Sequence, residues 1–162
     1  MKRVLKLGSA AIAAACLFSQ PAMGHGFDLK EANGETFGAV LRDLGYRAKI
    51  TTDNIGDPLV ETTMDGIGVK VFFHNCNDSQ TGCEDIQFSV GFDMPDGTPM
   101  AAIEQWNEGK LYGTAYLDEE NDPFLKLTVQ VGPGGTPELI EGYISTFEAV
   151  LAQFKDHIGF GG

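Results

Sequence analysis

The stretch Val69–Phe92 constrains the fold most, because it has the pattern of two β-strands joined by a short loop. Its apolar residues alternate with polar ones; they are Val69, Val71, Phe73, Ile86, Phe88, Val90 and Phe92. An alternation with a period of two buries one face of each strand. Cys76 and Cys83 stand at the two ends of the connecting loop, so a disulfide would close the neck of this hairpin.

The first 24 residues are predicted to be a Sec-type signal peptide. Basic residues precede an apolar run over residues 7–18, and the small residues Ala22 and Gly24 occupy the positions that signal peptidase reads. We expect cleavage between Gly24 and His25, and a periplasmic or secreted protein. The apolar run is shorter than the roughly 20 residues of a membrane span, so no membrane insertion is expected after cleavage. A lipoprotein cleavage box at Ala13–Cys16 is the alternative, but it lacks the usual leucine.

The remaining chain has the length of one domain. We expect a flexible start over residues 25–33 and a single domain over residues 34–160. Loss of the signal removes three of the eleven basic residues and none of the 23 acidic ones, which leaves a formal charge of −15. Such a polyanion repels nucleic acid and anionic membrane surfaces, so both are poor candidates as partners, and no nucleic-acid binding is predicted.

Cys76 and Cys83 are the two cysteines that remain after cleavage. An even number of cysteines in an exported protein favours a disulfide. Their spacing differs from a C-x-x-C redox motif, and no histidine pair lies nearby to form a zinc site. Closing so short a loop stabilises the fold by about 2–3 kcal/mol. The predicted disulfide is therefore structural.

Periodicity along the whole chain predicts an α+β fold of order α-ββββ-α-ββ-α. The expected elements are a helix over 34–44, strands over 46–50, 59–64, 69–75 and 84–92, a helix over 99–109, strands over 111–117 and 124–131, and a final helix over 137–158. Thr98 and Thr136 each precede a proline and are predicted helix N-caps. The strands are expected to form an antiparallel sheet of about six strands with the helices packed on one face.

Four aromatic residues are candidates for a surface that binds a partner. Tyr112 and Tyr116 share one face of the predicted strand 111–117, and Phe72 projects from the polar side of its own strand. Trp106, at the end of the second helix, is either a recognition anchor or a seal between that helix and the sheet. Either the helices cover this aromatic face or a partner uses it.

Metal binding has a few candidate residues. Cleavage after Gly24 would make His25 the N-terminal residue, whose amine and imidazole bind copper, and His74 or His157 could complete the site. For His74 the alternative is a surface residue at a strand end, and for His157 it is a favourable position at the negative end of a helix dipole. The acidic loops lack the spacing of a calcium loop. No cofactor is predicted.

No catalytic motif is present: the sequence has no G-x-S-x-G, Walker loop, H-E-x-x-H or dinucleotide fingerprint. No catalytic residue is therefore predicted, and the protein is not expected to be an enzyme. The sequence specifies neither a reaction nor a ligand.

Several short motifs occur in an order that resembles the YbjN-domain family. They are Gly45-Tyr46, Gly56-Asp57-Pro58, the pair Cys76 and Cys83, Ile86-Gln87-Phe88, Trp106-Asn107, Ala115-Tyr116-Leu117-Asp118, Asp122-Pro123 and Gly134-Gly135. The resemblance implies bacterial sensory-transduction regulators with a fold similar to type III secretion chaperones, which often dimerise. It implies no catalytic residues.

The expected function is therefore a non-catalytic binding or regulatory module of the bacterial envelope. Its partner would be a polypeptide or a second copy of the chain. Two alternatives remain open at this point: a metal-binding protein or metalloenzyme that uses His25 or His74, and a structural or stress-related envelope protein without a specific ligand.

Overall fold

The computed structural model describes residues 33–132 and 136–161. The predicted signal peptide, His25 and nearly all of the predicted flexible start lie outside the described residues, as do Gly134 and Gly135. Among the described helices, none combines the length and hydrophobicity that a membrane span requires.

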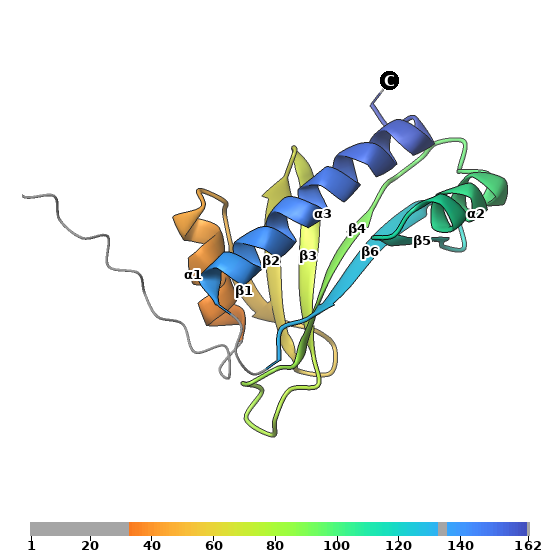
Figure 1. Ribbon diagram of the computed structural model, residues 1–162. Coiled ribbons are helices and arrows are strands. Elements are labelled where there is room, and N and C mark those ends of the chain that lie inside the picture. Colours follow the sequence, from red (N-terminus) through yellow and green to blue (C-terminus); the bar gives the residue numbers. More distant parts are fainter. Residues whose placement is uncertain (1–32, 133–135, 162) are drawn as a thin grey trace, which may run out of the picture.

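The described chain forms three helices and six strands in the predicted order (Figure 1). The elements are α1 (Gly34–Asp43), β1 (Lys49–Thr52), β2 (Pro58–Met64), β3 (Ile67–His74), β4 (Asp85–Gly91), α2 (Met100–Gly109), β5 (Thr114–Leu117), β6 (Pro123–Gln130) and α3 (Pro137–Ile158). All the strand pairs are antiparallel, in the spatial order β1-β2-β3-β4-β6-β5. The predicted α+β class and the single six-stranded sheet are therefore confirmed.

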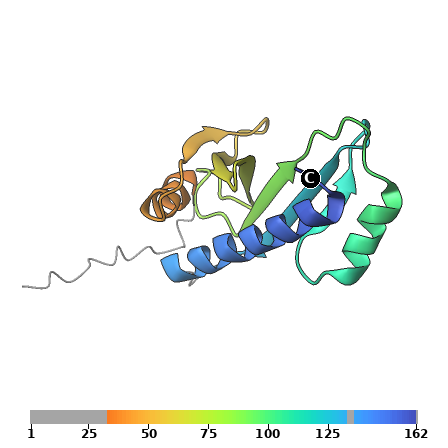
Figure 2. The same cartoon turned by 90° about the horizontal axis from the view of Figure 1, so that it is seen from above.

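All three helices pack on the same face of the sheet (Figure 2). Phe37 of α1 contacts the rings of Phe73 and Phe88, and Phe147 of α3 stacks on Phe88 with ring centroids 4.8 Å apart. Trp106 of α2 meets Phe154 of α3, again with ring centroids 4.8 Å apart. These aromatic contacts join the helices and the central strands into one core, as the alternation of β3 and β4 predicts.

The two predicted threonine caps have different outcomes. Thr136 caps α3, because its side chain accepts a hydrogen bond from the backbone N–H of Leu139. Thr98 does not cap α2: the helix begins at Met100, with Pro99 as N-cap and no side-chain cap bond. The backbone N–H of Thr98 is instead bonded to the carbonyl of Asn121. This contact with a distant loop holds Thr98 outside the helix, so the prediction was wrong by one residue.

Two strands are shorter or shifted relative to the prediction. β1 begins at Lys49 instead of Tyr46, because the Tyr46 N–H still bonds to the Leu41 carbonyl at the end of α1. β5 begins at Thr114 instead of residue 111. Gly113 precedes it with φ +81°, and a Cβ there would lie 2.6 Å from Cγ1 of Val150 in α3. This close approach turns the chain away from β6 before β5 begins.

Candidate functional site

One face of the sheet carries no helix among the described residues, and we call it the open face. Directly paired residues of antiparallel strands project to the same side of a sheet. The open face therefore consists of the following residues: Lys49, Thr51, Leu59, Glu61, Thr63, Gly68, Lys70, Phe72, His74, Asp85, Gln87, Ser89, Gly91, Thr114, Tyr116, Phe124, Lys126, Thr128 and Gln130.

Aromatic rings lie on the open face in two groups. On β3, Phe72 is half-buried and its ring stacks on His74 with centroids 6.5 Å apart. On β5 and β6, Tyr116 stacks on Phe124 at 5.2 Å, and Lys126 Nζ lies 4.6 Å from the Tyr116 ring centroid. Tyr116 is 37% exposed. Phe124 was not singled out from the sequence, although its pairing opposite Tyr116 makes it part of the same group.

The predicted aromatic surface of Phe72, Tyr112 and Tyr116 is not one patch. Phe72 and Tyr116 share the open face, but they lie three strand spacings apart across the sheet and about four residues apart along the strands. Together these offsets separate the two residues by about 20 Å. Tyr112 lies in the segment before β5 and not on a strand, so its predicted place beside Tyr116 in one strand was wrong. It is 55% exposed.

Trp106 does not belong to a partner surface. Its side chain is only 1% exposed, packs against Phe154, and donates a hydrogen bond of 2.9 Å from Nε1 to the carbonyl of Gly113. Of the two predicted roles, the seal between helix and sheet is the one observed. Burial excludes the alternative role as an exposed anchor.

Asn107 has a role that the sequence did not reveal. Its side-chain amide donates to the Ala115 carbonyl at 2.9 Å, and its carbonyl accepts from the Ala115 N–H at 2.8 Å. These two groups of Ala115 point away from β6, because Ala115 occupies a non-hydrogen-bonded pair with Leu125. Asn107 thus takes the place of a neighbouring strand at the outer edge of β5.

A hollow of about 430 Å³ lies just before the first residue of β5, where β6 continues without β5 beside it. It is lined by Gln87, Leu111, Tyr112, Gly113, Thr114, Lys126, Leu127 and Thr128. Leu111 is 88% exposed, so the rim carries a large apolar side chain that no described residue covers. The hollow combines apolar surface, the Lys126 ammonium and the edge of β6.

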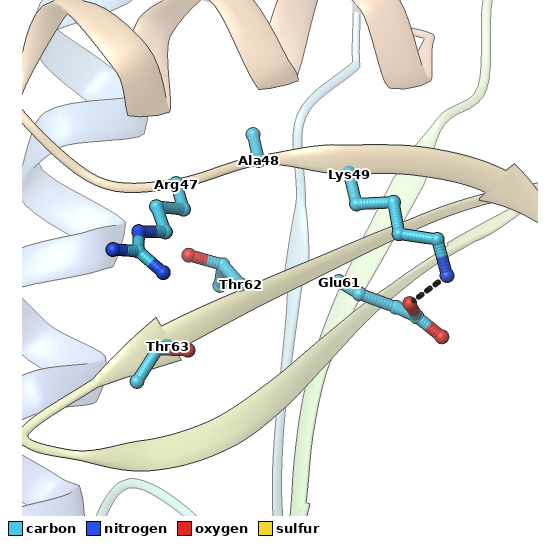
Figure 3. Close-up of a pocket in the computed structure, with 6 residues that line it drawn as sticks. All are labelled: Arg47, Ala48, Lys49, Glu61, Thr62 and Thr63. Atoms are coloured by element: carbon cyan, nitrogen blue, oxygen red, sulfur yellow. Dashed lines mark hydrogen bonds and ion pairs between the residues drawn. The ribbon is translucent and has the colours of Figure 1, made fainter.

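A smaller hollow of about 280 Å³ lies where β1 separates from β2 (Figure 3). It is lined by Ala48 and by five residues with polar or charged side chains, which are Arg47, Lys49, Glu61, Thr62 and Thr63. Lys49 forms a 2.6 Å ion pair with Glu61, and this hydrogen bond lowers the pKa of the Glu61 carboxyl. Thr62 is buried, and its hydroxyl has no hydrogen-bond partner in the part of the chain that the structure describes.

The acidic loops use their carboxylates to close turns. Asp53 Oδ1 accepts the N–H groups of Ile55 and Asp57, and Asp118 Oδ1 accepts those of Glu120 and Asp122. Within residues 33–132 and 136–161, no group of three His, Cys, Asp or Glu side chains could hold a metal ion.

The histidines within the described chain lie at opposite ends of the fold. His74 is the last residue of β3 and stacks on Phe72. His157 in the last turn of α3 makes a 2.7 Å hydrogen bond through Nε2 with the Ala102 carbonyl. The neighbouring Lys155 forms an ion pair with Asp65, in the turn just before β3 begins. The two histidines are therefore separated by the length of β3. The predicted copper site is built on His25, which lies outside the described residues.

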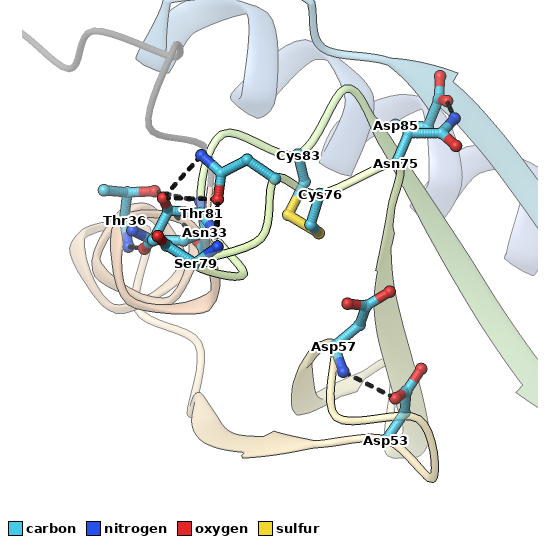
Figure 4. The surroundings of a disulfide bond; sticks show 11 residues. Asn33, Thr36, Asp53, Asp57, Asn75, Cys76, Ser79, Thr81, Cys83 and Asp85 are labelled. Carbon is cyan, nitrogen blue, oxygen red and sulfur yellow. Dashed lines mark hydrogen bonds between the residues drawn. A yellow bond between two sulfur atoms is a disulfide. The ribbon is translucent and has the colours of Figure 1, made fainter.

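The predicted disulfide between Cys76 and Cys83 is present in the loop between β3 and β4 (Figure 4). Next to it, the Asn75 side chain donates a 2.6 Å hydrogen bond to Asp85. Cys83 is 2% exposed and belongs to the core. Burial of one sulfur and closure of the strand neck indicate a structural bond.

The family model of YbjN, described as "Putative bacterial sensory transduction regulator", matches residues 33–160. The chain belongs to this family. No curated protein matches it. Among solved structures it is similar to the Yersinia pestis type III secretion chaperone SycH, solved in complex with a stable fragment of YscM2. That similarity has a TM-score of 0.48 and 10% identity, and it covers 75% of this chain and 98% of that chain.

Proposed function

We propose that this protein is an exported, non-catalytic regulatory module of the bacterial envelope that binds a polypeptide on its open face. The observation that carries the proposal is the open face of the six-stranded sheet. No described helix covers this face, and it displays Phe72, Tyr116 and Phe124. Partly exposed aromatic residues among polar ones are typical of surfaces that bind proteins. Membership of a family described as sensory transduction regulators supports a binding role.

The charge of the open face supports a neutral or acidic partner. Lys49, Lys70 and Lys126 lie in one row across the sheet, whereas the whole chain has a formal charge of −12. The ion pair with Glu61 neutralises Lys49, which leaves Lys70 and Lys126 available. An acidic polypeptide is repelled by the rest of the surface and attracted to this row, so electrostatics would direct it to the open face.

Export is part of the proposal and has two supports. The N-terminal sequence has the pattern of a signal peptide, and the chain contains a disulfide, which persists in oxidising compartments. Comparing the mass of the protein from the periplasm with that of the full chain tests this part. An intact N-terminus in a cytoplasmic fraction would contradict it.

A pull-down from envelope extract tests the binding function. We expect the wild-type chain to retain a partner, and we expect the substitutions Phe72→Ser and Tyr116→Ser, alone or together, to weaken retention. Leu139→Ser is the matched control, because Leu139 is 39% exposed, close to the 37% of Tyr116, but lies on α3. Retention that is unchanged in the open-face variants, or lost equally in the control, would refute the proposal.

A further inference from the structure

The edge of β6 is only partly covered. β5 pairs with β6 from Pro123 to Lys126, whereas β6 continues to Gln130. On its other side β6 is paired with β4 along its length, up to Gln130 opposite Asp85. The last four residues of β6 therefore have a neighbouring strand on one side alone among the described residues.

The hydrogen-bond pattern identifies the free groups on that edge. The N–H of Val131 bonds to Glu84 and the Pro123 carbonyl accepts from Phe92, so odd-numbered residues of β6 face β4. Thr128 and Gln130 consequently direct their backbone N–H and C=O groups away from the sheet. The Gln130 carbonyl accepts a bond from the Tyr143 hydroxyl, and within residues 33–132 and 136–161 no residue pairs with the Gln130 N–H or with either backbone group of Thr128.

The vacancy on this edge is the position that β5 would have occupied. In the register that pairs Thr114 with Lys126, Tyr112 would stand opposite Thr128. The turn at Gly113 removes Tyr112 from that position and leaves the hollow of about 430 Å³ there. A line of free backbone donors and acceptors beside a hollow is complementary to another main chain in extended conformation.

We propose that this edge of β6 receives an extended segment of another polypeptide, which adds to the sheet in line with β5. The inference rests on the proposed function and specifies how the partner is held. Backbone bonds to Thr128 and Gln130 supply affinity, the apolar side chains of Leu111 and Leu127 receive an apolar residue, and Lys126 receives an acidic one.

The other edges of the sheet are less suited to receive an added strand. Asn107 blocks the outer edge of β5 at Ala115 with two hydrogen bonds. β1, at the opposite edge of the sheet, has four residues, begins with Lys49 and is preceded by Arg47 two residues earlier. Short edge strands with charged side chains resist pairing. A second copy of the chain is disfavoured as occupant, because two whole chains with a formal charge of −12 each repel one another, whereas a short extended segment brings few charges to the edge.

Backbone amide exchange with a model peptide tests the proposal. The probe is a soluble capped peptide of about six residues that alternates valine with threonine and glutamate, long enough to span about 20 Å. We expect it to slow exchange of the Thr128 and Gln130 amides in the full chain. A version of the peptide that is N-methylated at alternate residues cannot pair and should have no effect.

Two variants separate backbone pairing from side-chain effects. Thr128→Pro removes the edge-facing N–H at a position where a strand tolerates proline, and should weaken peptide binding by about tenfold. Thr128→Val is the matched control: like the proline variant it loses the 2.8 Å hydroxyl bond from Gln87, but it keeps the N–H and should bind as wild type. Circular dichroism checks that both variants are folded.

Several outcomes would overturn the proposal. The first is that millimolar peptide leaves the exchange rates of the Thr128 and Gln130 amides unchanged. The second is that the Thr128→Pro and Thr128→Val variants bind the peptide equally well. The third is that both amides are already protected from exchange in the protein alone. Protection that grows with protein concentration would assign the edge to a second copy. Protection in dilute protein would assign it to the chain itself. If Thr128→Pro retains the envelope partner while Phe72→Ser and Tyr116→Ser lose it, the edge proposal fails and the proposed function stands.

Discussion

At the scale of single residues, Asn107 shows how one side chain protects a sheet. The outer edge of β5 would otherwise expose the backbone N–H and C=O of Ala115, which are a template for pairing with other chains. A side-chain amide presents an N–H donor beside a carbonyl acceptor, so it can bond to both backbone groups of one residue as a neighbouring strand would. Asn107 therefore caps this edge and also fixes the end of α2 to β5.

Replacement of Asn107 measures how much this cap contributes to the stability of the protein. Asn107→Ala should lower the free energy of unfolding by about 1–2 kcal/mol, because two hydrogen bonds to a partly buried backbone are lost. Urea denaturation monitored by circular dichroism gives the value. Glu108→Ala is the control at the neighbouring exposed position and should change stability by less than about 0.5 kcal/mol. Equal stability of the two variants would contradict the capping role.

Tyr46 and Glu148 form a second informative pair, which joins the segment after α1 to α3. The Tyr46 hydroxyl donates a 2.5 Å hydrogen bond to Glu148, and this bond raises the pKa of Tyr46 from 10.0 to about 12. In the pH range from 10 to 12 the folded phenol keeps its proton while the unfolded one loses it. This contribution to stability is complete below pH 10 and disappears as the pH rises through 12.

The expected result is a loss of stability with rising pH that depends on Tyr46. Wild-type protein should become less stable between pH 10 and 12, and Tyr46→Phe should lose less over the same range. Denaturant midpoints at a series of pH values measure this difference. Tyr112→Phe, which leaves the Tyr46–Glu148 bond intact, should follow the wild-type curve. Parallel curves for wild type and Tyr46→Phe would exclude the linkage.

At the scale of elements, the length of β5 depends on its contact with α3. Gly113 has φ +81° and lies against Val150 and Leu125, so the chain turns here and β5 contains four residues. The turn leaves Leu111 and Tyr112 outside the sheet and uncovers the edge of β6. One glycine therefore decides both the extent of a strand and the position of the hollow.

Gly113→Ala should destabilise the protein by about 2–4 kcal/mol, because an alanine is strained at this φ and its Cβ would lie 2.6 Å from Val150 Cγ1. Gly109→Ala provides the comparison: it lies at the end of α2, and nothing lies within 4 Å of a Cβ there. The control variant should be neutral or slightly more stable. Thermal unfolding of both variants measures the difference, and a neutral Gly113→Ala would show that the chain relaxes around the added methyl group.

At the scale of the whole molecule, one core unites all the described elements. Phe147 of α3 is fully buried and stacks on Phe88 in β4, which also contacts Phe37 of α1. Because helices from both ends of the described chain pack on the same strands, neither half retains its core alone. We expect the domain to unfold in one cooperative transition.

Removal of the Phe147 ring tests this cooperativity. Phe147→Ala should cost about 3–5 kcal/mol and should lower the stability of α1, α3 and the sheet together. Fluorescence of Trp106 and far-ultraviolet circular dichroism should report the same denaturant midpoint. Leu139→Ala, at an exposed position of the same helix, should have little effect. Two separate midpoints would contradict a single core.

The features that followed from sequence depend on local periodicity and local turn chemistry. Alternation identified Val71, Phe73 and Phe88 as core residues, and each is completely buried. The Asp65-Gly66 turn joins β2 to β3, and both of its residues have positive φ. The apolar stripe of α3 follows helical spacing. Side-chain direction in a strand or helix depends on neighbours a few residues away, so these patterns can be read without the fold.

The candidate site depended on contacts between distant residues, which periodicity does not encode. The sequence allowed Trp106 to be a surface aromatic residue, but in the structure Phe154 packs against it. Tyr112 lies outside the strand predicted for it, because the chain turns at Gly113, which packs against Val150. The role of Asn107 required β5 to lie beside α2. The amino-acid sequence by itself therefore determined the order of the elements, their buried faces and the paired cysteines. The tertiary structure alone decided where β5 begins and which sheet edge is free, because close packing between segments far apart in the chain sets both.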